Sequence, residues 1–451
     1  MMRCGWIWLF AALLALWGCG KPSSKSKGDR NESAATDSPA IDEFAQLLSQ
    51  ARDGNVTAQS RVGVRYHNGV NVTQDHAEAF KWLSKAAAQG HAFSQYSVGR
   101  MYLLGTGRPR DLLKAAEWLR RAAEQGYKSA QNDLGAMYRN GDGVEQNATL
   151  AVTWYQKAAM QGDADAQHNL GLLYFQGDGV PQDLKKAAHW TGQAAQQGKA
   201  QAQFDLGVMH AAGKGVAQNM ALAAQWHRRA AENGLVKAQV ELAVLHTTGQ
   251  GVDHNLTKAY KWMKRAADKG HPVALLNLGL MKEQGQGTTQ DLKEAARLYR
   301  VLAERSDAQA QLYLANLYRD GRGVEKNPIE GEKWLRKSAE QGLLGAQNQL
   351  GVMYTKSNEV AQNFPEAVKW LQKAADQGSP VAQYNLADLY QQGKGVKQNL
   401  AEACFWFTLS ERKKFALARS ARKKLEEKLT SDQMTEIDQR VSVWLAKRAH
   451  K

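Results

Sequence analysis

Residues 164–198 read ADAQHNLGLLYFQGDGVPQDLKKAAHWTGQAAQQG, and this stretch decides the fold. In its first half, Leu170 and Tyr174 are four residues apart and therefore share one face of a helix. Two glycines separated by one residue then interrupt the helical pattern. In the second half, Ala187 and Trp190 mark the apolar side of another helix. The stretch predicts two helices joined by a tight turn.

The same pattern occurs ten times at intervals of 36 residues, as expected for a repeat array. A small residue marks the first helix of each unit: Gly63, Gly99, Gly135, Gly171, Gly207, Ala243, Gly279, Ala315, Gly351 and Ala387. Tryptophan, replaced once by leucine, marks the second: Trp82, Trp118, Trp154, Trp190, Trp226, Trp262, Leu298, Trp334, Trp370 and Trp406. One unit cannot bury both faces, but stacked units can. We predict an all-α protein, a right-handed α-solenoid of ten 36-residue helix-turn-helix repeats.

Capping residues recur at both ends of the second helices. Asp or Asn, whose side-chain oxygen can accept from unpaired N–H groups of the first turn, precedes each of them: Asp75, Asp111, Asn147, Asp183, Asn219, Asn255, Asp291, Asn327, Asn363 and Asn399. Glycine, which suits a left-handed C-terminal cap, follows them at Gly90, Gly126, Gly162, Gly198, Gly234, Gly270, Gly342 and Gly378. Ser306 and Lys414 occupy this place in the two remaining units.

The Gly-x-Gly turn of each unit resembles a phosphate-binding or calcium-binding loop. It occurs eight times in full, however, no predicted strand precedes it, and its middle residue varies between units. The carboxylate that follows alternates with asparagine, which caps a helix equally well but weakens a calcium site. We therefore expect these turns to be structural.

Two histidines, His210 and His246, occupy the tyrosine place in neighbouring units. Helices one repeat apart are separated by about 10 Å, too far for both imidazoles to bind one metal ion. No histidine is placed beside a nucleophile in a pattern that indicates catalysis. We predict no catalytic residue, no metal site, no cofactor and no small-molecule substrate.

The full pattern is A-x-x-x-L-G-x-x-Y-x-x-G-x-G-V-x-x-D-x-x-x-A-x-x-W-x-x-x-A-A-x-x-G. It resembles the Sel1-like repeat, a relative of the tetratricopeptide repeat, and covers residues 55–412. The resemblance implies a scaffold that binds other proteins. Some cysteine-rich Sel1-like proteins have been linked to penicillin binding, but this chain lacks their paired repeat cysteines. We therefore expect no enzyme, and keep a hydrolase only as an alternative.

The N-terminus has the pattern of an export signal. A basic start is followed by the apolar stretch Trp6–Trp17, which is shorter than the roughly 20 residues that span a bilayer. The ending Leu16–Cys19 resembles the bacterial lipobox, which implies cleavage before Cys19 and lipid on its thiol. An ordinary secreted protein is the alternative. Because Gly20 is not aspartate, the resemblance favours an outer-membrane lipoprotein that faces the periplasm.

The predicted organisation has five parts. They are a signal peptide (1–18), a flexible Ser- and Lys-rich tether (19–38), a capping helix (39–54), the repeats (55–412) and a basic helical C-terminal cap (413–451). In this last part, Thr430 to Gln433 has the spacing of a capping box. The net charge of +15 indicates anionic partners. Since export makes nucleic acid an unsuitable partner, an anionic polysaccharide of the envelope remains possible, and residues 405–451 could form a polyanion-binding patch.

One column of side chains varies between units and is therefore a candidate binding surface. By analogy with tetratricopeptide repeats, the place three residues before the small residue should face the concave groove. Our predicted partner-binding residues there are Tyr96, His168, Phe204, Val240, Leu276, Leu312 and Tyr384. The four consecutive apolar members could form an exposed stripe. The alternative is that the column is partly buried between helices.

These observations favour an adaptor of the cell envelope, anchored through Cys19, that binds a protein partner on its concave face. A binding module for an anionic envelope polymer is the second interpretation.

Overall fold

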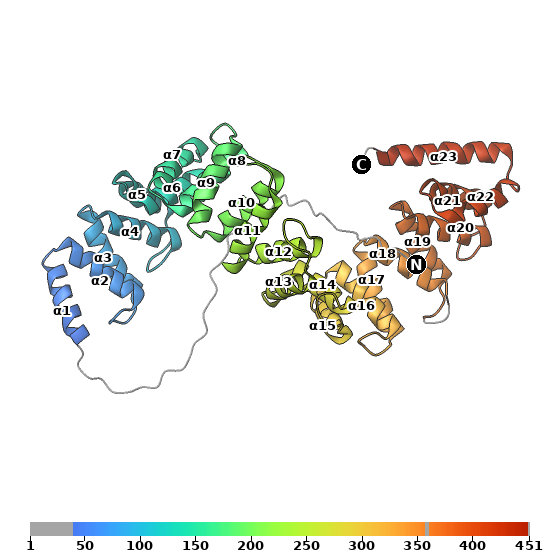
Figure 1. The fold of residues 1–451 in the computed structure, drawn as a ribbon, viewed down its shortest axis with the longest axis horizontal. Coiled ribbons are helices and arrows are strands. Elements are labelled where there is room, and N and C mark those ends of the chain that lie inside the picture. Colours follow the sequence, from blue (N-terminus) through green and yellow to red (C-terminus); the bar gives the residue numbers. More distant parts are fainter. Residues whose placement is uncertain (1–38, 357–359, 450–451) are drawn as a thin grey trace.

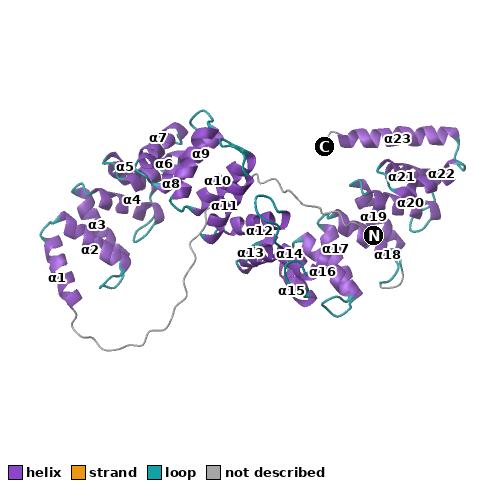
Figure 2. Ribbon diagram, in the orientation of Figure 1, coloured by secondary structure: helices purple, strands orange, loops and turns teal. Residues whose placement is uncertain are grey.

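The computed structural model describes residues 39–356 and 360–449. The regular structure of these residues consists of 23 α-helices (Figure 2). They follow one another in a single elongated row from α1 at one end to α23 at the other (Figure 1). The predicted all-α solenoid of helix-turn-helix repeats is thereby confirmed. The predicted signal peptide, the tether and Cys19 lie outside the described residues.

Each repeat consists of a first and a second helix. The first helices are α2 (Val56–Asn68), α4 (Ala92–Leu104), α6 (Lys128–Asn140), α8 (Ala164–Gln176), α10 (Ala200–Ala212), α12 (Val236–Thr248), α14 (Pro272–Gln284), α16 (Ala308–Asp320), α18 (Leu344–Tyr354) and α20 (Pro380–Gln392). The second helices are α3 (His76–Ala88), α5 (Leu112–Glu124), α7 (Ala148–Met160), α9 (Leu184–Gln196), α11 (Met220–Glu232), α13 (Leu256–Asp268), α15 (Leu292–Ala303), α17 (Pro328–Glu340), α19 (Phe364–Asp376) and α21 (Leu400–Arg412). Helix α1 (Pro39–Arg52) precedes them, and α22 (Ala416–Glu426) and α23 (Ser431–Ala449) follow.

The Gly-x-Gly turn joins the two helices of a unit and also contacts the unit before. Gly177 ends α8 in the left-handed conformation, with φ +74°, and its N–H donates to the carbonyl of Leu173. At Gly179, a Cβ would lie 2.4–2.8 Å from atoms of Ala148, the first residue of the preceding second helix. Any side chain there would clash with the neighbouring unit, so both glycines have structural reasons to be present.

The predicted caps of the second helices are confirmed. All ten Asp or Asn side chains accept a hydrogen bond from the first turn; Asp183, for example, accepts from the N–H of Lys186 at 3.0 Å. At the other end, Ser306 and Lys414 keep the left-handed conformation of the glycines that they replace, with φ of 66° and 62°. Backbone geometry is thus maintained even where the residue type does not favour it.

A ladder of buried glutamines ties each unit to the one before. The side chain of Gln167 in α8 donates to the carbonyl of Ala159 in α7 at 3.1 Å. Its Oε1 accepts from Gln197 at the end of α9, at 2.7 Å. One glutamine therefore connects the second helices of two successive units. Nine glutamines make the first bond: Gln59, Gln95, Gln131, Gln167, Gln203, Gln239, Gln311, Gln347 and Gln383.

The ladder is incomplete where the donor side chain changes. Seven of the nine glutamines accept from a Gln or Asn thirty residues later. The other two are Gln239 and Gln383, and the residues thirty places later are Lys269 and Lys413. The Oε1 atoms of both glutamines are buried without a hydrogen-bond partner among the described residues. In the seventh unit Leu275 takes the place of the glutamine itself.

The C-terminal helices close the array. The predicted capping box at the start of α23 is present, because Thr430 N–H donates to Gln433 Oε1 and Gln433 N–H donates to Thr430 Oγ1. Ile437 and Val441 on this helix are buried. Arg440 forms an ion pair with Glu402 of α21 at 2.6 Å. Part of the basic charge in this region therefore holds the cap in place.

We predict that the ladder stabilises the array unevenly. Gln203→Leu should lower the free energy of unfolding by about 1–3 kcal/mol, because it leaves the carbonyl of Ala195 without its side-chain donor. Gln239→Leu should cost clearly less, since it also removes a buried oxygen that has no partner. Urea denaturation, supported by hydrogen exchange of the affected helix, measures both. Equal losses of unfolding free energy in the two variants would contradict a stabilising role for the bond that Gln203 accepts from Asn233.

Ser306→Gly should stabilise the protein by about 0.5–1 kcal/mol, because glycine adopts positive φ without the steric cost of a Cβ. Gly270→Ala, the matched change in the preceding unit, should destabilise it by a similar amount or more. Thermal unfolding of the two variants measures both effects. Unchanged unfolding temperatures would show that the residue at this helix end does not affect stability.

Candidate partner-binding groove

The predicted partner-binding column lies between neighbouring first helices. His168 Nε2 lies 2.7 Å from Asp205 Oδ2 of the next unit, and the His168 side chain is buried. Leu312 is also buried, in the apolar core at the C-terminal end of the array. Asn132, in the same column, accepts from Asn169 of the next unit at 3.1 Å. The column thus contributes to the contact between units.

The remaining members of the column are half-buried by similar contacts. Phe204 lies 5.0 Å from the ring of His227, and Tyr96 lies 4.9 Å from the ring of Tyr127. Three others also pack against neighbouring side chains: Val240 and Leu276 against the core of units six to eight, and Tyr384 against Phe407 and Phe415.

The column is therefore not the exposed apolar stripe that the sequence suggested. Partial burial between helices, which was the alternative, describes it better. A charged residue at Leu312 would disrupt the core in addition to any effect on a partner.

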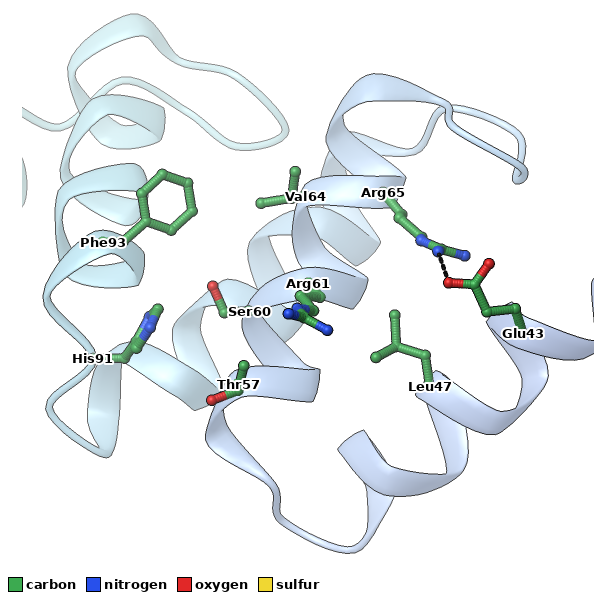
Figure 3. Close-up of a pocket in the computed structure, with 9 residues that line it drawn as sticks. All are labelled: Glu43, Leu47, Thr57, Ser60, Arg61, Val64, Arg65, His91 and Phe93. Atoms are coloured by element: carbon green, nitrogen blue, oxygen red, sulfur yellow. Dashed lines mark hydrogen bonds and ion pairs between the residues drawn. The ribbon is translucent and has the colours of Figure 1, made fainter. Parts of the chain in front are cut away.

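An accessible groove lies instead at the N-terminal end of the array. A hollow of about 570 Å³ opens between α1, α2 and the start of α4 (Figure 3). A second hollow of about 330 Å³ continues along α2 and α4. Val64 and Phe93 line both. We call the two hollows together the N-terminal groove.

Apolar side chains form part of the groove lining, here called its floor. Leu47 of α1, Val64 of α2 and Phe93 of α4 line the first hollow (Figure 3). Leu104 lines the second. Phe93 is 36% exposed and Leu104 is 62% exposed, so both side chains are accessible to a ligand. The edge of the Phe93 ring contacts Tyr127 of the next unit, with 6.3 Å between ring centroids. The floor is thus supported by the following repeat.

Three arginines border this floor. Arg61 is exposed and forms no hydrogen bond or ion pair in the described part of the chain. Arg65 donates to Glu43 Oε1 at 2.9 Å, and Glu43 is the one acidic residue among those that line the two hollows. Arg100 donates to the hydroxyl of Tyr96 at 3.1 Å. The groove therefore combines apolar surface with an excess of positive charge.

This charge distinguishes the first unit from those that follow. Arg61 lies two residues before the small residue of its repeat, and the same place holds Ser97, Asp133, Asn169, Asp205 and Glu241 in the next five units. Burial raises the pKa of Asp133 and of Glu241. This position is thus cationic in the first unit and carries a carboxyl group in the third, fifth and sixth units.

Sequence reasoning missed this groove because it followed a single column. The signal that could have found it is the combination of Arg61 with Phe93, which lies six residues before the small residue of the second unit. The contribution of α1 was not visible, since its packing on α2 follows no repeat pattern.

The stacked helix pairs define the class of the protein, an α-solenoid scaffold with accessible side chains on its first-helix face. A family model of the Sel1 repeat matches ten successive segments: 56–91, 92–127, 128–163, 164–199, 200–235, 236–271, 272–307, 308–343, 345–379 and 380–413. The chain belongs to the Sel1 repeat family.

Two solved structures support this assignment. One is c5321, described as a protective antigen present in uropathogenic Escherichia coli strains, with 32% identity and a TM-score of 0.67. The similarity covers 90% of this chain and 94% of c5321. The other is a Sel1 repeat protein from Oxalobacter formigenes, with 29% identity and a TM-score of 0.54, covering 73% of this chain and 98% of that one. None of the curated proteins compared with the chain matches it.

Clusters of potential metal ligands and helices able to span a bilayer are both absent from the described residues. No group of three or more His, Cys, Asp or Glu side chains among them could hold a metal ion. Cys404 is buried and unpaired, and burial raises the pKa of its thiol to about 11. Among the described helices, none combines the length and the apolar character needed to cross a bilayer.

His227, which packs on Phe204, makes the middle of the array sensitive to acid. Burial lowers the pKa of His227 to about 4, against 6.5 for an unperturbed imidazole. Below pH 6.5 the unfolded chain therefore binds a proton that the folded chain does not, and stability falls as the pH decreases toward 4. Leucine occupies the equivalent position in several other units. His227→Leu should therefore reduce the loss of unfolding free energy between pH 7.5 and pH 4.5 by about 2 kcal/mol. Urea denaturation at the two pH values measures it. An unchanged pH dependence would contradict the assignment.

Proposed function

We propose that this protein is a lipid-anchored adaptor of the bacterial envelope, attached to the outer membrane through Cys19, that binds a protein partner in the N-terminal groove. Sel1 repeats generally serve as scaffolds for protein–protein interaction, and the described fold is such a scaffold. A rigid array supplies preorganised contacts, and a membrane anchor raises the local concentration of the partner.

The observation that carries this proposal is the composition of the groove. Stacking between units buries much of the repeat surface, whereas Arg61 and Phe93 are exposed on the first helices α2 and α4. The groove is also formed in part by α1, the helix that directly follows the predicted tether. A partner bound there would be held close to the anchor.

The envelope location rests on the N-terminal sequence. The apolar stretch and the Leu16–Cys19 ending favour export and lipidation. The E. coli relative is described as a protective antigen, a description that suits a protein reached by antibodies outside the cytoplasm.

A second candidate function is supported by the opposite face. The ten second helices carry 23 Lys and Arg against 13 Asp and Glu, whereas the ten first helices carry 8 against 7. Six exposed cations stack on tryptophan rings and form no ion pair in the described part of the chain: Lys85, Lys157, Arg229, Arg265, Lys337 and Lys373. Such a row could bind an anionic envelope polysaccharide.

One experiment tests the anchor and the adaptor role together. Wild-type protein should partition with outer membranes and retain a partner from envelope extracts, and Cys19→Ala should release the protein into the soluble fraction with its binding intact. Membrane fractionation and affinity purification with mass spectrometry measure both. A Cys19→Ala protein that stays with membranes would refute lipidation.

The same purification separates the two candidate functions. An adaptor should lose its partner when Arg61 and Phe93 are replaced. If retention depends instead on Lys157 and Arg229 and disappears at high salt, the polysaccharide interpretation is correct. Retention of no envelope component by wild-type protein would contradict both.

A further inference from the structure

The N-terminal groove has features that define the chemistry of its ligand. We infer that it binds an extended peptide segment in which a carboxylate lies next to apolar side chains, an inference that rests on the adaptor role proposed above.

The shape favours an extended chain. The groove runs across α1, α2 and α4, and neighbouring helix axes are about 8–10 Å apart, so it is roughly 20 Å long. An extended strand rises about 3.3 Å per residue. About six residues of peptide therefore fit along it. Val64 and Phe93 lie where the two hollows meet, near the middle of such a segment.

The charge favours a carboxylate. Arg61 has no partner in the described part of the chain, and its planar guanidinium can donate two parallel hydrogen bonds to a carboxylate. Arg65 is on the same helix, one turn away, and lines the same hollow (Figure 3). Its ion pair with Glu43 is open to solvent on one side, because 67% of the Glu43 side chain but only 20% of the Arg65 side chain is accessible. Solvent on the Glu43 side weakens the pair, so Arg65 can share an incoming carboxylate.

The arrangement excludes a simple polyanion. Arg61 and Arg65 line the same hollow as the apolar side chains of Leu47, Val64 and Phe93 (Figure 3). A polymer with a charge on every unit would place some of these charges against apolar side chains, which is unfavourable. A single carboxylate flanked by apolar residues matches both the arginines and the apolar side chains of the groove.

The test uses the full-length protein and degenerate hexapeptide libraries. In one library a central position is aspartate, and in the matched library it is asparagine, both with amidated C-termini. A third library has asparagine and a free C-terminal carboxylate. Peptides retained by immobilised protein are counted by mass spectrometry. The third library shows whether the carboxylate comes from a side chain or from a chain end.

We expect apolar peptides with a carboxylate to be enriched on wild-type protein by at least about tenfold over asparagine counterparts, since a hydrogen bond to a charged group contributes about 1.5–3 kcal/mol. Arg61→Gln should remove this preference, and Phe93→Ser should remove the selection for apolar neighbours. Arg228→Gln and Val381→Ser serve as matched controls elsewhere on the array. Arg228 is an exposed arginine on a second helix, and Val381 is 37% exposed on α20. Both should behave like wild type.

Several outcomes would overturn the inference. It is wrong if aspartate and asparagine libraries are retained equally, or if Arg228→Gln has the same effect as Arg61→Gln. It is also wrong if polyglutamate without apolar residues is retained as well as the selected peptides. If the aspartate and asparagine libraries are retained equally while an envelope partner is still lost from the Arg61→Gln and Phe93→Ser proteins, the carboxylate inference fails and the adaptor role stands. If wild-type protein retains no partner, the adaptor role itself fails.

Discussion

The structure depends on one constraint, that most polar groups buried between stacked helices need a hydrogen-bond partner. Each second helix is covered by the next unit, so that its last carbonyl groups and the side chains beside them lose contact with water. A glutamine such as Gln167 satisfies this requirement in two directions, by donating to Ala159 and accepting from Gln197. Because the bonds cross the boundary between units, they also fix how far and at what angle one unit sits on the next.

The ladder and the apolar core complement each other along the array. Between Ala151 and Leu242 the buried apolar residues form four small clusters, and polar residues such as Thr191 and His227 occupy places that are leucine elsewhere. In this range Gln167 and Gln203 make both ladder bonds, whereas Gln239 makes only the first. Between Ala243 and Leu317 the apolar cluster is continuous, and there Leu275 replaces the ladder glutamine. Each boundary between units thus keeps at least one means of attachment, as expected of an array stabilised by contacts between neighbours.

The sequence predicted the fold well because its determinants are local and repeat. A cap such as Asp183 or a turn glycine such as Gly177 acts within a few residues, so that one unit reveals the rule for all. The glutamine ladder was harder to predict from the sequence than the caps and turns, although Gln167 directly follows the alanine of the repeat motif. The groove could not be predicted from the repeats, because it depends on α1 and on Arg61 and Phe93, which differ from their equivalents in other units. Position in the repeat also did not reveal that His168 and Leu312 would be covered by the next helix.

The most direct test of this account is hydrogen exchange of the full-length protein in which Asn233 is replaced by leucine. Asn233 lies on the surface of its helix end, and its side chain donates to Gln203 at 2.9 Å. If the ladder ties neighbouring units together, amides in α9, α10 and α11 should exchange about fivefold faster, as expected for the loss of about 1 kcal/mol. The rest of the array should keep its protection. Unchanged protection in these three helices, or a loss spread evenly over the whole array, would contradict the account.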